Sequence, residues 1–184
     1  MVLFTKVTQS PNFEGCSKLQ QWDGTNIKTR SGHIGGSALH SITSHNTAGV
    51  AYFPNMENLS GTDGGCKYLT KWFLPKYKTS GNWPFRGIAS GSLMDYGPES
   101  TALRLDYVNQ PTVVIRNTTP PSVSSISVAK TIYVPASAVE TYKANSTFSG
   151  KASVIYAIGG AEWAAAFGSS DEYADYDLYG VPHS

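Results

Sequence analysis

Short segments in which apolar and polar side chains alternate recur along the chain. A period of two is typical of a β-strand with one buried face, because successive side chains of a strand point to opposite sides. We therefore predict that one set of positions points into a core: Leu19, Trp22, Leu69, Trp72 and Leu74. The positions between them are predicted to point outward: Gln21, Asp23, Lys71 and Phe73.

These segments belong to an internal repeat. Gly15–Trp22 and Gly65–Trp72 both have the pattern G-C-x-x-L-x-x-W and lie 50 residues apart. One apolar anchor is predicted for each repeat unit: Leu19, Ile42, Leu69, Leu93, Val114 and Ile132. Their steps of 23, 27, 24, 21 and 18 residues fall mostly within the roughly 20–29 residues of a leucine-rich repeat. One unit cannot bury its own apolar edge, so we expect about five stacked coils.

Two parts of the chain resemble one known family. Phe13–Leu19 resembles the F-x-G-C-x-x-L motif of BspA-like leucine-rich repeats, and Gly65–Pro75 repeats it with a closing Leu-Pro. Asn117–Pro121 and Ile132–Lys143 resemble the terminal cap of that family, with its TTPP turn, IYVP strand and SVEAYK helix. The resemblance covers residues 10–160, except that residues 32–44 and 81–91 depart from the pattern. It implies a recognition or scaffold module of the kind found on gut and oral bacteria and in their phages, without catalytic residues.

The segment after the last repeat is predicted to close the stack. Pro135 ends a strand and suits the first turn of a helix, since it has no N–H to satisfy. Residues 136–144 are good helix formers, with Glu140 and Lys143 three residues apart, and residues 152–158 are predicted as a closing strand. The expected fold class is mainly β with short helices (α+β): a leucine-rich-repeat solenoid with a C-terminal helical cap and an appended tail.

Composition agrees with one domain of short strands over residues 1–160. Of the 184 residues, 12% are aromatic and only 15% are charged, against ~25% charged in an average domain. No apolar run approaches the ~18 residues of a membrane span, so no membrane insertion is expected. The net charge of +1 gives no global reason to expect nucleic acid. Residues 1–160 carry +6 and residues 161–184 carry −5, which indicates a boundary between them.

The acidic segment 161–184 is predicted to be a tail that makes contacts. Residues 161–167 are expected to form a short helix with Trp163 and Phe167 on one side. Three more aromatic residues follow among the acids: Tyr173, Tyr176 and Tyr179. Aromatic rings at this density are typical of interface anchors. We favour docking of the tail on a partner, or on the basic residues 1–160 of its own chain, over a disordered tail. We therefore expect an oligomer or a complex.

The candidate catalytic and metal-binding residues form no known motif. Cys16 and Cys66 are expected about 10 Å apart at ~4.8 Å per strand, beyond the ~7 Å limit of a disulfide. We interpret them as buried and inert. Three histidines match no metal-binding spacing: His33, His40 and His45. With no nucleophile elbow or phosphate loop either, we expect no enzyme, no cofactor and no metal.

Basic and aromatic residues interleave between residues 67 and 86, a composition that can bind single-stranded nucleic acid. Trp72 is at a position predicted to point into the core, so at least one of these aromatic side chains is expected to be buried instead of available for binding. A solvated face or a protein- or glycan-binding face is favoured. Nucleic acid is therefore not expected as a partner.

The sequence favours a non-enzymatic structural or attachment protein of a larger assembly. Residues 1–9 contain no apolar segment of the length of a secretory signal, which favours a phage virion component. The alternative is a bacterial cell-surface adhesin, or a protein- or glycan-binding module, whose signal peptide was removed; both alternatives place the chain on a virion or outside the cell. Expected partners are proteins, a second copy included, and a cell-surface protein or glycan. The predicted recognition face comprises Gln21, Asp23, Ser41, Thr43, Lys71 and Phe73.

Overall fold

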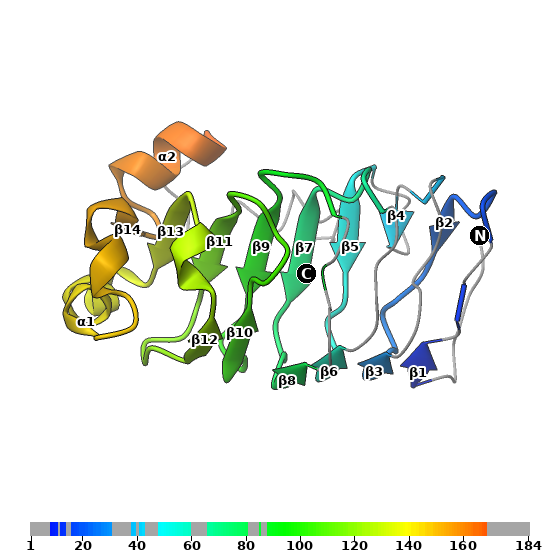
Figure 1. Cartoon of the computed structure of the whole chain (residues 1–184), viewed down its shortest axis with the longest axis horizontal. Helices are drawn as coiled ribbons and strands as arrows, with labels where there is room; N and C mark the ends of the chain where they lie inside the picture. Colours follow the sequence, from blue (N-terminus) through cyan, green and yellow to red (C-terminus); the bar gives the residue numbers. More distant parts are fainter. Residues whose placement is uncertain are drawn as a thin grey trace.

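The computed structural model describes residues 8–10, 12–13, 16–30, 38–39, 41–42, 48–59, 66–80, 85 and 88–168. The fold is mixed α/β, with short strands in mostly parallel sheets and few short helices. Figure 1 shows two rows of strands that run along the long axis of the molecule, with the helices at one end.

The first row is an eight-stranded sheet in which the order of the strands across the sheet equals their order along the chain. Each neighbouring pair is parallel. The strands are β2 (Gln21–Trp22), β4 (Ser41–Ile42), β5 (Val50–Tyr52), β7 (Lys71–Leu74), β9 (Leu93–Tyr96), β11 (Thr112–Ile115), β13 (Thr131–Val134) and β14 (Ile155–Ala157).

The second row contains shorter strands in two parallel sheets. They are β1 (Gln9–Ser10), β3 (Thr29–Arg30), β6 (Asn58–Leu59) and β8 (Thr79–Ser80) in one sheet, and β10 (Ala102–Arg104) and β12 (Ser122–Ser124) in the other. Parallel neighbours need a crossover connection, and most crossovers here pass through the second row. We call the face of the eight-stranded sheet that points to the second row its inner face, and the opposite one its outer face.

The inner face carries the main core. One residue per strand is paired across the middle of the sheet, and each is at most 2% exposed: Trp22, Ile42, Ala51, Trp72, Met94, Val113, Ile132 and Ile155. Leu69 and Leu74 are fully buried in the same cluster, and Leu19 packs against it. The predicted inward positions are therefore confirmed.

Two of the predicted anchors are wrong, because they lie on the outer face. We call the row of paired inner-face residues from Trp22 to Ile155 the core row. Leu93 pairs with Lys71, and Val114 pairs with Asp95, so each lies one position away from the core row in its strand. Both side chains are buried, but within a second apolar cluster. Hydrophobicity alone therefore does not distinguish the two faces of this sheet.

Strand β5 is missing from the predicted repeat. Its Ala51 pairs with Ile42 nine residues earlier, inside the 27-residue step that the anchors assign to one unit. The sequence does contain a pattern that indicates β5. Residues 51–56 (AYFPNM) share with residues 72–77 (WFLPKY) an aromatic residue, then an apolar residue, a proline, a polar residue and another apolar residue. The G-C pair that marks the units of Leu19 and Leu69 is absent there, and this strand is not among the predicted units.

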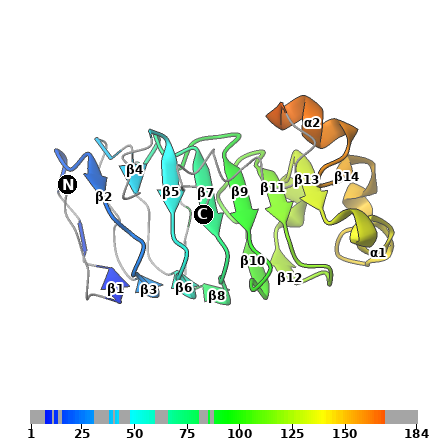
Figure 2. The ribbon, with the colours of Figure 1, turned by 180° about the vertical axis from the view of Figure 1, so that it is seen from behind.

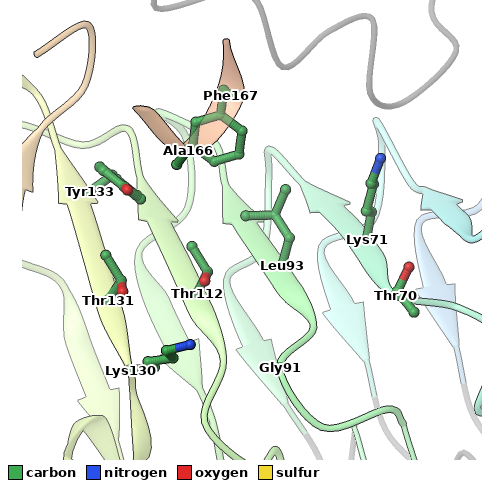
Figure 3. A pocket seen from close by; sticks show the side chains of 10 residues that line it. All are labelled: Thr70, Lys71, Gly91, Leu93, Thr112, Lys130, Thr131, Tyr133, Ala166 and Phe167. Carbon is green, nitrogen blue, oxygen red and sulfur yellow. The ribbon is translucent and has the colours of Figure 1, made fainter. Parts of the chain in front are cut away.

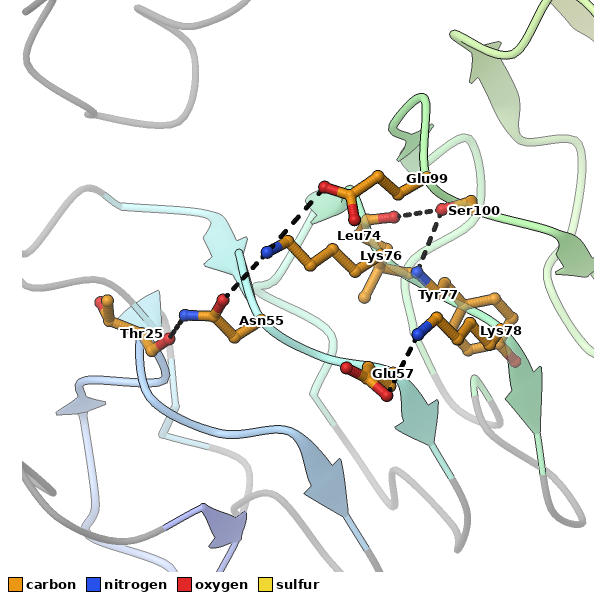
Figure 4. A network of polar contacts seen from close by, with 9 residues as sticks. All are labelled: Thr25, Asn55, Glu57, Leu74, Lys76, Tyr77, Lys78, Glu99 and Ser100. Atoms are coloured by element: carbon orange, nitrogen blue, oxygen red, sulfur yellow. Dashed lines mark hydrogen bonds and ion pairs between the residues drawn. The ribbon is translucent and has the colours of Figure 1, made fainter.

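Polar side chains join successive turns between the two rows of strands (Figure 4). The hydroxyl of the buried Ser100 donates to the Leu74 carbonyl at 2.7 Å and accepts from the Tyr77 amide at 3.1 Å. The Asn55 amide group donates to the Thr25 carbonyl at 2.9 Å. These bonds satisfy backbone groups that strand pairing leaves open. Two partly exposed ion pairs lie beside them: Lys76–Glu99 and Lys78–Glu57.

Gly97 follows β9 and lies against the turn that follows β7. A Cβ atom at Gly97 would meet the Pro75 carbonyl oxygen at 2.9 Å and the Pro75 Cα still closer. Gly97→Ala is therefore expected to force two turns apart and to lower the free energy of unfolding by about 1–3 kcal/mol. Denaturant unfolding measures this. Gly150→Ala is the matched control, since a Cβ there meets nothing within 4 Å; equal losses in the two variants would contradict the close approach.

The predicted C-terminal helix is confirmed, whereas the closing strand predicted over residues 152–158 forms only over Ile155–Ala157, because the 3-10 helix Ser149–Val154 occupies its first part. After η1 (Ile126–Val128) and β13, the chain forms η2 (Ala136–Ala138), α1 (Val139–Ala144), η3 (Ser149–Val154) and β14. The buried Tyr142 of α1 donates its hydroxyl to the carbonyls of Asn117 and Thr119 at 2.8 and 3.3 Å, which joins this helix to the turn after β11. Burial raises the pKa of Tyr142 above its ordinary value. The Glu140–Lys143 ion pair also forms, at 3.2 Å.

Candidate functional site

Two rows of side chains line the outer face of the eight-stranded sheet. The row nearer the start of the strands contains Gln21, Ser41, Val50, Lys71, Leu93, Thr112 and Thr131. The row two residues further along contains Tyr52, Phe73, Asp95, Val114, Tyr133 and Tyr156. Because parallel pairing places equivalent positions side by side, this face gathers residues from most of the length of the chain.

Helix α2 (Ala161–Phe167) packs on the outer face at the end of the sheet that holds β11, β13 and β14 (Figures 1 and 2). The fully buried Trp163 meets the Tyr133 ring edge-on, with 5.3 Å between ring centroids, and Phe167 lies 5.6 Å from the same ring. The Tyr133 hydroxyl donates to the Glu162 carbonyl at 3.2 Å. Gly168 then ends the helix in a left-handed conformation, with φ of 74°.

A groove of about 450 Å³ opens on the outer face beside the end of α2 (Figure 3). Its floor and rims come from four neighbouring strands, the turns before them and the helix: Thr70, Lys71, Gly91, Leu93, Thr112, Lys130, Thr131, Tyr133, Ala166 and Phe167. Leu93 lies between the other side chains, and Lys71 and Lys130 lie on opposite sides of it (Figure 3). The strands of these two lysines are three spacings apart, which separates their backbones by roughly 14 Å.

The groove is electropositive. The ammonium groups of Lys71 and Lys130 form no ion pair with any residue that the structure describes. Burial, with smaller contributions from Tyr156 and Glu162, raises the pKa of Tyr133 above its ordinary value. Among the described residues that line it, the groove therefore has two unpaired positive charges and no acidic side chain.

A buried ion pair occupies the outer face further along the strands. Asp95 is 0% exposed, and Arg116 donates to its carboxylate from Nε and Nη2 at 2.9–3.2 Å. In the sheet, Asp95 lies between Phe73 and Val114. This pair is not among the residues predicted from the sequence. The one signal for it was a single acid inside the otherwise apolar strand 93–96, which demands a buried partner.

The lining of the groove suits binding of a polar ligand. Three threonines, two lysines and the aromatic side chains of Tyr133 and Phe167 combine hydrogen-bonding, charged and apolar surface. Within the described part of the chain, no group of three or more His, Cys, Asp or Glu residues is placed to hold a metal ion. No helix among the residues described is long and apolar enough to cross a membrane.

The predicted recognition face is only partly accessible. Gln21, Ser41 and Lys71 share one row of the outer face, and Lys71 lines the groove. Ser41, however, is fully buried and cannot contact a ligand. Asp23 accepts hydrogen bonds from the N–H and the hydroxyl of Thr25 at 2.9 and 2.6 Å, so it stabilises its own turn. Thr43 lies outside the described residues.

The prediction that Phe73 is exposed is wrong. Its side chain lies on the outer face, as the alternation predicts, but it is only 4% exposed. The ring stacks on Tyr52 with 5.2 Å between centroids and belongs to the second apolar cluster, together with Leu93 and Val50. The outer face thus has a core of its own, which the pattern of one strand does not reveal.

Phe73→Ala is expected to lower the free energy of unfolding by about 3 kcal/mol, because it leaves a cavity beside Tyr52. Phe73→Leu keeps most of the volume and should cost less than about 1.5 kcal/mol. Urea unfolding of the two variants at one pH provides the comparison. A Phe73→Ala variant as stable as the parent would show that this side chain is solvated.

The first part of the acidic tail packs on its own chain. The predicted helix at residues 161–167 is confirmed, with Trp163 and Phe167 on the side that faces Tyr133. Trp163 is fully buried there and is not available to a partner. The remaining predicted anchors of the tail lie outside the described residues: Tyr173, Tyr176 and Tyr179.

The other candidate residues divide between core and surface. Cys66 is buried as predicted, but Cys16 is exposed, because its turn precedes β2 at the end of the sheet. Neither cysteine forms a disulfide. Trp72 of the basic and aromatic segment is fully buried, as predicted, and so are two further rings whose burial was not predicted: Tyr77 and Phe85. The three histidines lie outside the described residues: His33, His40 and His45.

No family model matches the chain, and no curated protein and no solved structure is significantly similar to it. The resemblance to BspA-like repeats therefore depends on the motifs in residues 13–19, 65–75, 117–121 and 132–143. The geometry of the outer face is the main evidence that bears on function.

Proposed function

We propose that the chain is a non-enzymatic recognition module, built as a leucine-rich-repeat solenoid of the BspA-like type, which attaches a larger assembly to its target. The observation that supports the repeat is the register of the core row, which advances by 19–22 residues per strand from Ala51 to Ile132. That spacing is close to the roughly 20–29 residues of a leucine-rich repeat. Solenoids of this kind present one extended face to their ligands.

The groove on the outer face is the proposed binding site, and its ligand is an acidic protein or glycan. Lys71 and Lys130 supply two unpaired ammonium groups, which form strong charge-assisted hydrogen bonds with carboxylates. The threonine hydroxyls and the rings of Tyr133 and Phe167 add the hydrogen bonds and apolar contact that orient a ligand. No pair of acid and base is required for such a role.

The virion and the cell surface are the two settings predicted from the sequence, and both need this kind of attachment. A phage particle would use the groove to bind a host envelope component, and an adhesin would use it to bind a host glycan or protein. The genes beside the coding sequence distinguish the two settings, since phage structural genes accompany the first and secretion or anchoring functions the second.

The proposal is tested by probing an array of acidic and neutral bacterial polysaccharides and acidic peptides with the full-length chain. The array is also probed with a full-length variant whose residues Asp171, Glu172, Asp175 and Asp177 are changed to amides, so that the chain's own acids do not compete. Binding to an acidic member of the array is expected in at least one form.

Lys71→Ala combined with Lys130→Ala should weaken that binding at least tenfold, since each lost charged contact is worth about 1.5–3 kcal/mol. Lys18→Ala with Lys28→Ala removes two exposed lysines elsewhere and serves as the matched control. Equal loss in both double variants, or no acidic ligand for either form of the chain, would contradict the proposed site.

A further inference from the structure

We propose that residues 169–184 of this chain dock along the outer face of its own eight-stranded sheet, where their carboxylates pair with Lys71 and Lys130. Three features of the molecule support this docking: the point at which the chain leaves α2, the charges of the groove and the apolar strip beside it. Docking of this kind does not depend on the proposed function.

The chain leaves α2 at the rim of the groove. Phe167, the last residue of the helix, lines the groove, and Gly168 ends the helix directly after it. The segment that follows therefore begins at the site where the proposal places it. Sixteen residues remain after Gly168, with an extended reach of at most about 55 Å, whereas the two lysines lie roughly 14 Å apart.

The charges of the groove and the segment are complementary. The groove carries Lys71 and Lys130 without an ion-pair partner among the described residues. The segment has no Lys or Arg and contains four acids: Asp171, Glu172, Asp175 and Asp177. In an extended chain, Asp171 and Asp175 are separated by about 13.6 Å, which matches the spacing of the two lysines.

A strip of apolar side chains continues from the groove toward β5. Val50, Phe73 and Leu93 form a strip on the outer face and are at most 8% exposed. α2 packs at the other end of the sheet (Figure 1). Three tyrosines are the next aromatic side chains along the sequence, and they alternate with the acids that the lysines attract: Tyr173, Tyr176 and Tyr179. In the extended chain, Tyr173 and Tyr179 point to the same side as Asp171 and Asp175, so these two rings can contact the strip while the acids reach the lysines.

The same chain is favoured over a second copy because the segment is tethered. Only three residues separate Phe167 from Asp171. A short flexible tether keeps the effective concentration of its ligand near the millimolar range, above any ordinary protein concentration. If the groove is the recognition site proposed above, the docked segment competes with the external acidic ligand and lowers its apparent affinity.

The test uses the full-length, ¹⁵N-labelled protein and measures backbone order parameters of residues 169–184. Docking predicts values near the ~0.85 of rigid backbone for the residues around the acids. Lys71→Glu with Lys130→Glu should lower these values below about 0.6, the range of flexible segments. The control, Lys18→Glu with Lys28→Glu, makes the same change of net charge at exposed positions away from the groove and should leave them unchanged.

A charge swap completes the test. Asp171→Lys with Asp175→Lys should release the segment in the parent protein and restore its order in the Lys71→Glu/Lys130→Glu protein. A flexible segment in the parent, or the same response to the groove variant and the control, overturns the proposal. Light scattering over a hundredfold range of concentration is the second measurement. A dimer whose dissociation releases the segment overturns docking on the same chain and supports the oligomer predicted from the sequence.

The proposed function and the docking fail separately. Order parameters report on the segment without any external ligand, whereas the array reports on an external ligand with the tail acids neutralised. An ordered segment together with no array ligand leaves the docking intact and removes the recognition role. A flexible segment together with an acidic array ligand does the reverse.

Discussion

Replacing Trp72 by alanine is expected to lower the free energy of unfolding by about 3–5 kcal/mol. Trp72 is fully buried in the middle of the core row. Its ring packs against Phe53 and Phe85, with 6.4 and 5.7 Å between centroids, and its Nε1 donates to the Leu69 carbonyl at 3.2 Å. The variant therefore loses the largest kind of buried side chain and leaves a carbonyl without its donor. The surrounding turns are held by strand pairing on both sides, so they can collapse into the cavity only in part.

Denaturant unfolding followed by far-ultraviolet circular dichroism measures this loss, with the slope checked to confirm that both proteins unfold cooperatively. Tyr68→Ala is the control, because Tyr68 lies in the same repeat unit but is 52% exposed. It should change the free energy of unfolding by no more than about 0.5 kcal/mol. Similar effects of the two substitutions would show that the assigned inner face of β7 is wrong.

Asp95→Ala is expected to destabilise the fold by about 3–5 kcal/mol, because it leaves the Arg116 guanidinium in the sheet face without its buried carboxylate. The side chains of Asp95 and Arg116 are 0% and 8% exposed, and two guanidinium nitrogens bind the carboxylate. Water therefore cannot replace the lost partner at low cost.

A double-mutant cycle identifies the pair as the cause. Asp95→Leu combined with Arg116→Met replaces both charges by apolar groups of similar size, and such exchanges of a buried pair are often neutral. The double variant should be more stable than either single variant, with a coupling of about 2 kcal/mol or more. Additive losses would show that the two side chains do not interact. Exposed pairs such as Lys143–Glu140 should show less than about 1 kcal/mol in the same experiment.

Local patterns were sufficient for the elements whose signal lies within a few residues. Alternation of Trp72 and Leu74 with Lys71 and Phe73 identified the inner face, since the period of a strand is set by its own backbone. Helix formers after Pro135 and the run AEWAAAF predicted α1 and α2, because helix propensity is also a property of residues that are neighbours in the sequence. The site was anticipated through two residues that line the groove: Lys71 of the predicted recognition face and Phe167 of the predicted tail interface.

The sequence by itself determined which residues alternate, where the short helices form and that the tail opposes the body in charge. Tertiary structure alone decided the register between neighbouring strands, in which paired residues are 9 to 23 positions apart along the chain. That register placed Phe73 in a second apolar cluster instead of in water. It placed Leu93 in the same cluster instead of in the main core. It also brought Lys130 to the same groove as Lys71, and Arg116 to Asp95. These contacts join residues of different strands, and no pattern within a single strand specifies its lateral partner.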